Sequence, residues 1–318
     1  MFANTIVDDE GTPALVWAER PDPTPGAGEV LVRVRAVGIN AADRLQVMGF
    51  YPAPPGSPPD IPGLELAGSV EATGEGVTPW SEGDRVMAVV GGGAMAELAL
   101  VHERHLLPVP SNLSWEQAGG FAETFTTAHD ALFTQVGLTM GERVCVHGAA
   151  GGVGTSAVQL AAAAGCTVTA TVRNHEHHEA VRALGADVVI DPGDFVDAGP
   201  YDVILELVGA PNWPGNISAL ETWGRIMVIG VGAGPKTEIS LVDLMQKRAT
   251  IRASTLRSRP LEEKANAAQA MIRHVLPLVS EGALTVPVEE TFPLADAPAA
   301  FERFAAGGKL GKIVLVSD

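Results

Sequence analysis

Cysteine is nearly absent from this 318-residue chain, which has only Cys145 and Cys166. Two cysteines exclude a disulfide framework and any zinc site made of several thiolates. Both lie in apolar stretches, so we expect them to pack in the core as small hydrophobic side chains. The chain also lacks any uncharged apolar run of about 18 residues, the length that spans a bilayer. We therefore expect no membrane-spanning segment.

Basic residues are scarce as well: 21 lysines and arginines stand against 38 acids, which gives a formal net charge of −17. A charge of this sign repels nucleic-acid phosphates and anionic membrane surfaces, and no basic cluster offsets it. The first residues carry acids where a secretory signal would carry basic residues. We expect a cytoplasmic protein that binds neither nucleic acid nor membranes.

The pattern of the first third of the chain is that of a β-rich unit. Between residues 29 and 101, short apolar runs are punctuated by glycine and proline, and Val30, Val32 and Val34 alternate with their neighbours. The proline-dense stretch 50–63 cannot form regular structure, because proline lacks a backbone donor and restricts the residue before it. We expect an ordered surface loop there, of the kind that often lines active sites.

From about Ser114 the pattern changes to helical segments that alternate with β-branched runs. This alternation predicts a doubly wound parallel sheet of the Rossmann type. A helical segment over 261–281 and a terminal strand then follow, and we expect both to return to the first domain. The predicted domains are 1–118 with 260–318, and 119–259. The six predicted strands lie in RVCVHGA, CTVTATV, DVVID, YDVILELVG, GRIMVIGVG and ATIRASTL.

A glycine-rich turn, AAGGVG, follows the first of these strands and opens a helix at residues 149–154. Glycine turns end many strands, so the pattern alone is weak. In this context, backbone amides and a helix N-terminus meet where a diphosphate would lie. Gly151 would let the diphosphate approach the backbone, and Gly154 would let the helix pack on the sheet. Ala149 stands where the usual fingerprint has glycine. We interpret the turn as a dinucleotide site.

The end of the second strand bears on which dinucleotide is bound. NAD sites place a carboxylate there for the ribose hydroxyls, whereas NADP sites place a cation for the 2′-phosphate. This chain has Arg173 and Asn174, which favours NADPH, although Arg173 could instead be a solvated surface charge. His175, His177 and His178 follow without a cysteine or paired carboxylate nearby. We interpret them as exposed helix histidines, with His177 able to reach the phosphate, and predict no metal site.

Over nearly its whole length the chain resembles the zinc-free quinone oxidoreductases of the medium-chain dehydrogenase/reductase superfamily. The resemblance implies a GroES-like β-rich catalytic domain closed by the C-terminus, a Rossmann domain, and an NADPH site in the cleft between them. It rests, in the family's order, on VGINAADRLQVMGFYPAPPG, IPGLELAGSVEATGEGVTPWSEGDRV, GAAGGVGTSAVQLA, GRIMVIG, STLRSR and the terminal GKIVL.

The zinc-dependent members of the superfamily have a cysteine where this chain has Asn40, and a histidine where it has Leu64, before Glu65. The four-cysteine lobe that holds their structural zinc is also missing. The resemblance thus implies a metal-independent enzyme. Without a Lewis acid to polarise an isolated carbonyl, the substrate must be activated by its own conjugation, as quinones and enones are.

The resemblance also implies a set of site residues, with two departures from the family's pattern: His177 replaces a lysine of many members, and Pro192 a tyrosine of some. The residues expected to act in catalysis are Tyr51, Asn40 and Thr127. Those expected to bind the cofactor, with the end of the second strand included, are Asn40, Thr127, Ala150, Gly151, Gly152, Val153, Arg173, Asn174, His177, Gly230, Val231, Thr255, Leu256 and Lys312.

Tyr51 matches a family tyrosine at the mouth of the site, and a similar position in enoyl-thioester reductases is a proposed proton donor. It could equally be a loop tyrosine that packs on proline. Asp43 and Arg44 are expected on the same helix as Asn40, where we expect them to cap the helix or form a pair and not to act in catalysis.

The sequence as a whole predicts an NADPH-dependent reductase that transfers hydride to quinones or α,β-unsaturated carbonyl compounds. One alternative is an enoyl-thioester reductase, which should have a basic patch for the carrier phosphates; the chain shows none. The other is a structural or regulatory protein that binds the cofactor without turnover. We also expect a homodimer, formed through the sheet edge that 224–232 and 249–256 create.

Overall fold

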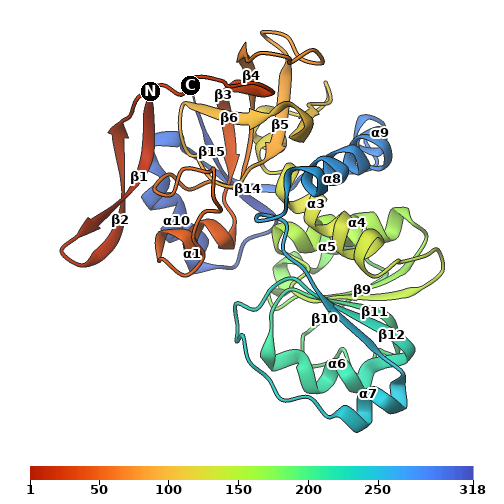
Figure 1. Ribbon diagram of the computed structural model, residues 1–318. Coiled ribbons are helices and arrows are strands. Elements are labelled where there is room, and N and C mark those ends of the chain that lie inside the picture. The colour runs from red at the N-terminus through yellow and green to blue at the C-terminus, as the bar shows by residue number, and fades with distance from the viewer. Residues whose placement is uncertain (318) are drawn as a thin grey trace. The chain divides into compact units, whose positions relative to one another are not determined.

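The computed structural model describes residues 1–317 and divides the chain into two compact units. The first contains Met1–Glu123 and the chain from Leu256 onward, and the second contains Thr124–Thr255. The first unit is therefore built from two segments far apart in the sequence, coloured red to yellow and blue in Figure 1. The predicted boundaries at residues 118 and 260 lie within about five residues of these limits.

A seven-stranded sheet forms the framework of the first unit, in the order β14-β15-β3-β4-β5-β7, with β6 paired to β3. A separate hairpin joins β1 to β2. The alternating valines that predicted a strand lie on β3, and all three are buried. The strands are β1 (Phe2–Asp9), β2 (Thr12–Glu19), β3 (Glu29–Gly38), β4 (Glu65–Thr73), β5 (Arg85–Val89), β6 (Leu98–His102), β7 (Leu106–Pro108), β14 (Val288–Pro293) and β15 (Lys312–Val316).

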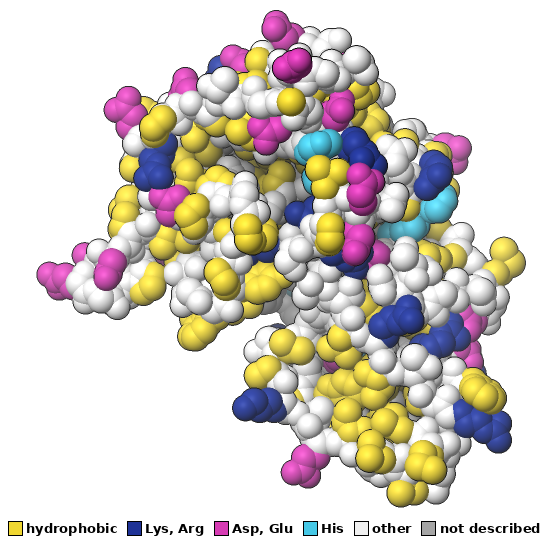
Figure 2. All heavy atoms as spheres, viewed as in Figure 1, with side chains coloured by type: hydrophobic (Ala, Val, Ile, Leu, Met, Phe, Trp, Pro, Cys, Tyr) yellow, Lys and Arg dark blue, Asp and Glu magenta, His cyan; other side chains and the backbone are white. Residues whose placement is uncertain are grey.

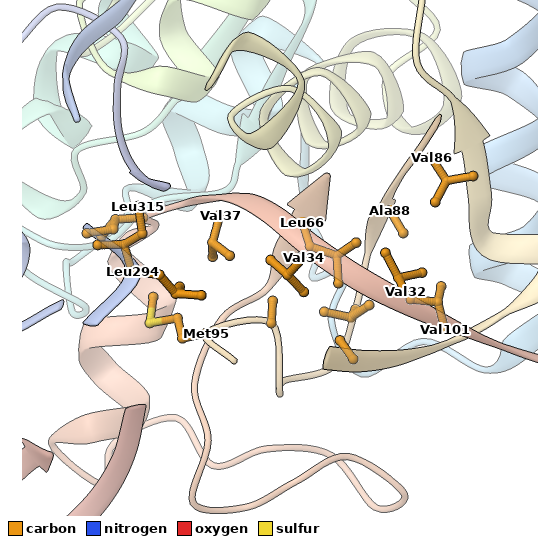
Figure 3. Packing of buried hydrophobic residues seen from close by; sticks show 14 of the residues in the cluster. Val32, Val34, Val37, Leu66, Val86, Ala88, Met95, Val101, Leu294 and Leu315 are labelled. Carbon is orange, nitrogen blue, oxygen red and sulfur yellow. The ribbon is translucent and has the colours of Figure 1, made fainter. Parts of the chain in front are cut away.

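The core of this unit lies against the sheet and draws on both segments of the chain. Figure 3 shows side chains of β3, β4, β5 and β6 gathered with others that come from the C-terminal segment. Fully burying an aliphatic side chain contributes about 1.5–3 kcal/mol, so this layer holds the two segments together. The labelled residues are Val32, Val34, Val37, Leu66, Val86, Ala88, Met95, Val101, Leu294 and Leu315, each less than 9% exposed.

The C-terminal segment returns to the first unit because β15 pairs antiparallel with β3, with Val314 opposite Gly38. The predicted helix over 261–281 is in fact two helices, α8 (Leu261–His274) and α9 (Leu276–Ser280). Pro277 near the start of α9 explains the break, because proline lacks the backbone donor that a continuous helix needs there. The other helices of this unit are α1 (Ala41–Val47), α2 (Trp115–Gly119) and α10 (Ala297–Ala306), with short 3₁₀ turns at Glu103–His105 and Leu294–Asp296.

The second unit contains the predicted doubly wound sheet. Its six strands run in the order β10-β9-β8-β11-β12-β13 and all pair in parallel. The chain starts at the centre of the sheet and proceeds outward in both directions, so the order reverses between β8 and β11. The fold class is confirmed. The strands are β8 (Arg143–Val146), β9 (Thr167–Thr171), β10 (Val188–Ile190), β11 (Tyr201–Glu206), β12 (Leu220–Val228) and β13 (Thr250–Ala253).

Strand β12 begins four residues before the predicted start at Gly224, because Leu220 pairs with Tyr201 before the ladder shifts register. Among the described residues, no helix is both long and apolar enough to cross a membrane. The helices of this unit are α3 (Ala122–His129, which starts in the first unit), a π-helical turn (Asp130–Gln135), α4 (Gly152–Ala163), α5 (His178–Ala183), α6 (Trp213–Ala219) and α7 (Leu241–Lys247), with 3₁₀ turns at His175–His177 and Ala210–Asn212.

Candidate active site

The glycine-rich turn joins the end of β8 to the start of α4. Gly148 has a φ of 64°, a conformation that favours glycine. Gly154 lies so close to the turn that a Cβ there would sit 2.4 Å from the Gly148 carbonyl oxygen, so only glycine fits. Gly151 precedes the helix with extended backbone (φ −76°, ψ 168°), and no side chain caps it. The N-terminal amides of a 12-residue helix are thereby left for an anion.

Ala149, the departure from the usual glycine pattern, is compatible with the turn. Its side chain is fully buried, and its backbone N–H donates to the Thr171 carbonyl oxygen on β9 at 3.1 Å. The left-handed backbone falls one residue earlier, so Cβ of alanine meets no conformational penalty. Ala150, Gly152 and Val153 are half-buried.

A buried polar network lies behind this turn, and none of its members was predicted from the sequence. The Nε2 atom of His147 donates to Asn216 Oδ1 (2.8 Å), and its Nδ1 accepts from the Thr171 hydroxyl (3.1 Å). Asn216 Nδ2 in turn donates to Glu206 Oε2 at 2.7 Å. Burial lowers the pKa of His147, which keeps the ring neutral and suits this pattern of one donor and one acceptor.

Glu206 uses its other oxygen to hold the turn that follows β11. Its Oε1 accepts from the backbone N–H of Val208 (2.7 Å) and of Gly209 (2.8 Å). Because β8 and β11 are neighbouring parallel strands, the network fixes two turns at the same edge of the sheet, at the point where the strand order reverses. Ligands of doubly wound sheets bind at this edge.

The end of β9 presents Arg173 and Asn174. Arg173 is exposed, and within residues 1–317 its guanidinium has no ion-pair partner. Asn174 caps the following 3₁₀ turn by accepting from the Glu176 backbone N–H at 3.1 Å, and its amide nitrogen lies 3.3 Å from a Glu176 carboxylate oxygen. His177 is half-buried one turn further on.

The remaining predicted residues of the second unit lie on three separate elements. Gly230 follows β12 and donates its backbone N–H to the Glu206 carbonyl oxygen (3.1 Å), which brings it beside the turns already described. Val231 is 45% exposed. Thr127 is buried on α3, and Thr255 is exposed after β13. The sheet therefore brings together the glycine turn and Gly230.

In the first unit, Asn40 begins helix α1 and all its polar atoms are engaged. Its backbone N–H donates to Asp43 Oδ2 at 2.8 Å, which confirms that Asp43 caps the helix. The side-chain Nδ2 donates to the Gly38 carbonyl oxygen (3.1 Å) and to Glu65 Oε1 (2.9 Å). Its Oδ1 accepts from Lys312 at 2.8 Å. Asn40 is thus held in one orientation.

Lys312 is only 3% exposed and uses its three ammonium protons inside this unit. Its Nζ atom lies 2.8 Å from the Ile39 carbonyl oxygen, 2.8 Å from Asn40 Oδ1 and 2.8 Å from Glu65 Oε1. Glu65 is fully buried, and its second oxygen accepts from the Glu123 backbone N–H at 2.8 Å. A direct contact of Lys312 with a cofactor would break one of these bonds. These bonds hold Lys312 and Asn40 in fixed positions relative to each other.

The donor set at the positions of the superfamily's catalytic zinc does not fit a zinc ion. Asn40 offers an amide where a thiolate would stand, and Leu64 is an apolar side chain that is 1% exposed. The Lys312 ammonium lies within 2.8 Å of both Asn40 Oδ1 and Glu65 Oε1, so a cation already neutralises this carboxylate. Zinc needs nitrogen, thiolate or carboxylate ligands arranged around an open centre.

Tyr51 lies at the start of the proline-rich loop and is held by Arg257. The Arg257 guanidinium, 2% exposed, donates to the carbonyl oxygens of Tyr51 (2.9 Å) and Gly91 (2.7 Å) and to the side chain of Gln46. It also stacks over the Tyr51 ring, 5.1 Å from the ring centre. The half-buried surroundings raise the pKa of the Tyr51 phenol, so the hydroxyl stays protonated at neutral pH.

Arg257 and Gln46 were not identified from the sequence as site residues. Arg257 immediately follows Leu256, which is buried at the start of the returning segment. Arg257 in STLRSR carries no spacing signal, and its partners lie about 160 to 210 residues earlier in the chain. Only the tertiary fold reveals that it anchors the loop.

Comparison with known proteins agrees with the two-unit architecture. Residues 26–111 match the alcohol dehydrogenase GroES-like domain, and residues 152–275 match the zinc-binding dehydrogenase domain. These are the two domains of the medium-chain dehydrogenase/reductase superfamily. The second of these domains carries zinc in its name, but the side chains at the zinc position of this chain remain the ones described above, which do not fit zinc.

The chain is 32% identical over 317 residues to the quinone oxidoreductase of Pseudomonas aeruginosa, with 96% of each chain covered. The structure matches a quinone oxidoreductase of Pseudomonas syringae with a TM-score of 0.88 at 29% identity, covering 99% of this chain and 100% of that one. A mycobacterial protein solved in complex with NADPH matches with a TM-score of 0.87 at 28% identity, with 99% and 100% covered. The chain belongs to the quinone oxidoreductase family of this superfamily, whose members are oxidoreductases that use a nicotinamide cofactor and act on small molecules.

Proposed function

We propose that the protein is an NADPH-dependent reductase that transfers hydride to quinones or α,β-unsaturated carbonyl compounds without zinc. The observation that carries the proposal is the combination of a diphosphate-type glycine turn with an exposed arginine at the end of β9. When bound, NADPH would supply the hydride.

The second unit supplies the residues for cofactor binding. The free amides at the start of α4 and the turn of Ala150–Val153 would receive the diphosphate. Arg173 would pair with the 2′-phosphate, and His177 stands one turn away on the same segment. The absence of a carboxylate at Asn174, where NAD sites have one, favours NADPH. The NADPH complex of the mycobacterial relative is consistent with this choice.

The first unit supplies groups that can act on the substrate. Asn40 is locked by Lys312 and Glu65, so its orientation needs no adjustment when substrate binds. Tyr51 keeps its proton at neutral pH and can donate it to, or hold, the oxygen of the reduced substrate. Because Asn40, Leu64 and the Lys312-paired Glu65 do not fit a zinc ion that would polarise an isolated ketone, conjugated carbonyl compounds are the substrates that this residue set suits.

The test is NADPH consumption by the purified enzyme with three substrate sets: quinones, enones and enoyl thioesters of coenzyme A. The proposal expects turnover with quinones or enones that exceeds turnover with thioesters. Preference for the thioesters would establish the rival enoyl-thioester reductase. If no substrate oxidises even one equivalent of NADPH in a single-turnover experiment, the protein is a cofactor-binding protein without turnover and the proposal is wrong.

We also propose a homodimer formed through the edge of the Rossmann sheet. The last strand, β13, has a neighbour on one side only, and most of its residues are exposed. Nearby, Leu241, Val242 and Met245 of α7 are 71%, 61% and 76% exposed. Figure 2 shows hydrophobic side chains gathered on the face of this unit. Large apolar patches and open sheet edges are typical of protein interfaces.

A further inference from the structure

Three metal-ligand side chains converge beyond the end of β9, in the second unit. His175 and His178 are three residues apart in the continuous helical stretch that runs from the 3₁₀ turn into α5, so they share one face. Asp191 follows β10, the strand that pairs in parallel with β9. The pairing of β10 with β9 brings the Asp191 carboxylate to these histidines, although Asp191 lies 13 residues after His178.

The distances within this His175–His178–Asp191 cluster are close to those of a metal site. One ligand atom of each residue lies within 4.8 Å of the other two. The His175 Nε2 and Asp191 Oδ1 atoms are 3.2 Å apart. Two ligands of a tetrahedral zinc with bonds of about 2.0–2.1 Å lie about 3.3 Å apart. This pair therefore already has the required separation, and no other grouping of this kind occurs among residues 1–317.

His178 has the partner that a ligating histidine commonly has. Its Nε2 lies 3.0 Å from the Val172 carbonyl oxygen, which can only accept, so Nε2 carries the proton. The lone pair of the neutral ring is therefore on Nδ1, free to bind a metal. A hydrogen bond from the second ring nitrogen to a backbone carbonyl orients metal-binding histidines and raises their basicity.

We propose that His175, His178 and Asp191 form a binding site for a divalent transition metal such as Zn²⁺, with water in the remaining coordination position. Two imidazoles and a carboxylate are a zinc-type donor set and are unsuited to Mg²⁺ or Ca²⁺, which prefer oxygen ligands. The His175 side chain is 72% exposed and that of Asp191 44%, so both can rotate to complete the geometry.

Occupation of this site would join the start of α5 to the end of β10. The site is separate from the residues at the superfamily's catalytic zinc position, which belong to the first unit. The site adjoins Asn174 and His177 of the proposed cofactor-binding segment, so its test measures metal binding and unfolding, which do not depend on the proposed reductase activity. We expect the metal to raise the unfolding temperature of the protein, because it binds the folded state and these ligands are not assembled in the unfolded chain.

The experiment is a titration of the metal-depleted protein with Zn²⁺ in a non-chelating buffer, followed by calorimetry and thermal unfolding. Co²⁺ titration gives a visible spectrum that reports the coordination geometry. The test variants are His175→Ala, which alters an exposed residue and should leave the fold intact, and Asp191→Asn. The matched controls are His274→Gln and Asp194→Asn, an exposed histidine and an exposed acid outside the cluster.

The proposal expects one Zn²⁺ per chain and an increase in unfolding temperature with the wild type and both controls. Each test variant should bind Zn²⁺ at least about tenfold more weakly and lose the thermal shift, since each removes a ligand. Binding by His175→Ala or Asp191→Asn that equals the wild type would overturn the proposal. Absence of a stoichiometric Zn²⁺ or Co²⁺ signal at millimolar metal would also overturn it.

Discussion

The guanidinium of Arg173 lies two residues past the end of β9, exposed and without an ion-pair partner among the described residues. The glycine turn cannot distinguish NADPH from NADH, because both carry the same diphosphate. The discrimination must come from the position that the ribose 2′-group reaches. Asn174 is already used to cap the following turn, which leaves Arg173 as the charged group at the strand end.

We therefore predict that Arg173→Ala raises the KM for NADPH by about 10- to 100-fold. Charge-assisted hydrogen bonds of this kind contribute roughly 1.5–3 kcal/mol, and about 1.4 kcal/mol corresponds to a factor of ten. The KM for NADH should change little, because NADH has no 2′-phosphate. Steady-state kinetics with both cofactors are the measurement. Equal losses for NADPH and NADH would show that Arg173 supports the fold and does not recognise the phosphate.

Tyr51 has the properties of a proton donor: a protonated phenol whose backbone is held by Arg257. Tyr51→Phe should lower the turnover of enones by about 10²–10⁴-fold, the usual contribution of general acid catalysis. Quinones should lose less, because the hydroquinone anion that forms is stable. Stopped-flow NADPH oxidation with one enone and one quinone measures both rates. If neither rate changes, Tyr51 serves only in packing.

Asp43, which caps the start of helix α1, should make the free energy of unfolding depend on pH. Asp43 is fully buried, and burial raises its pKa from 3.8 to about 7, against the opposing effects of its bond to Asn40 and of the Lys312 charge. The folded state thus binds this proton up to about pH 7, whereas the unfolded chain releases it near pH 4. The resulting stabilisation is complete below the unfolded pKa and is lost as the pH rises through the folded pKa.

Between pH 5 and 7, the wild type should therefore lose roughly 2–3 kcal/mol of unfolding free energy relative to Asp43→Asn, at about 1.4 kcal/mol per pH unit. The asparagine variant is expected to be less stable overall, because its Nδ2 cannot accept a hydrogen bond, but it lacks this titration. Urea unfolding of both proteins at several pH values is the measurement. Parallel pH profiles would contradict the raised pKa.

The strands of the Rossmann sheet and the proline-rich loop could be predicted from the sequence, because their signals are local. The β-branched runs from Val144 to Ala253 predicted all six strands of the Rossmann sheet, and the prolines of residues 50–63 predicted the loop. The break between α8 and α9 was missed, although Pro277 was visible, since the apolar periodicity continues across it.

The polar contacts that hold the site could not be predicted in the same way. Lys312 meets Glu65 only because β15 crosses to β3, and Asp191 approaches His175 only because β10 pairs with β9. Pairs that are brought together by strand pairing leave no periodic signal in the sequence. The family resemblance named Asn40 and Lys312, and the structure shows that the two side chains are hydrogen-bonded to each other.

For the whole molecule, we predict that two copies of the chain associate as a homodimer. An exposed sheet edge at β13 and the apolar surface of α7 should be covered by a second copy. Light scattering at micromolar concentration should then give about twice the 33.0 kDa of the chain. Replacing the exposed Met245 and Val242 by aspartate should shift the protein toward monomer without unfolding it. A wild-type mass of one chain would contradict the dimer.

The central claim, that this protein reduces conjugated carbonyl compounds with NADPH and without zinc, is tested most directly by the turnover of metal-depleted enzyme. The protein is dialysed exhaustively against a chelator, its metal content is measured, and NADPH oxidation with a model quinone is compared before and after. The account predicts unchanged turnover at less than about a tenth of an equivalent of zinc, because Lys312 and Asn40 occupy the would-be metal position. Turnover that falls with the zinc content and returns when zinc is added would contradict it.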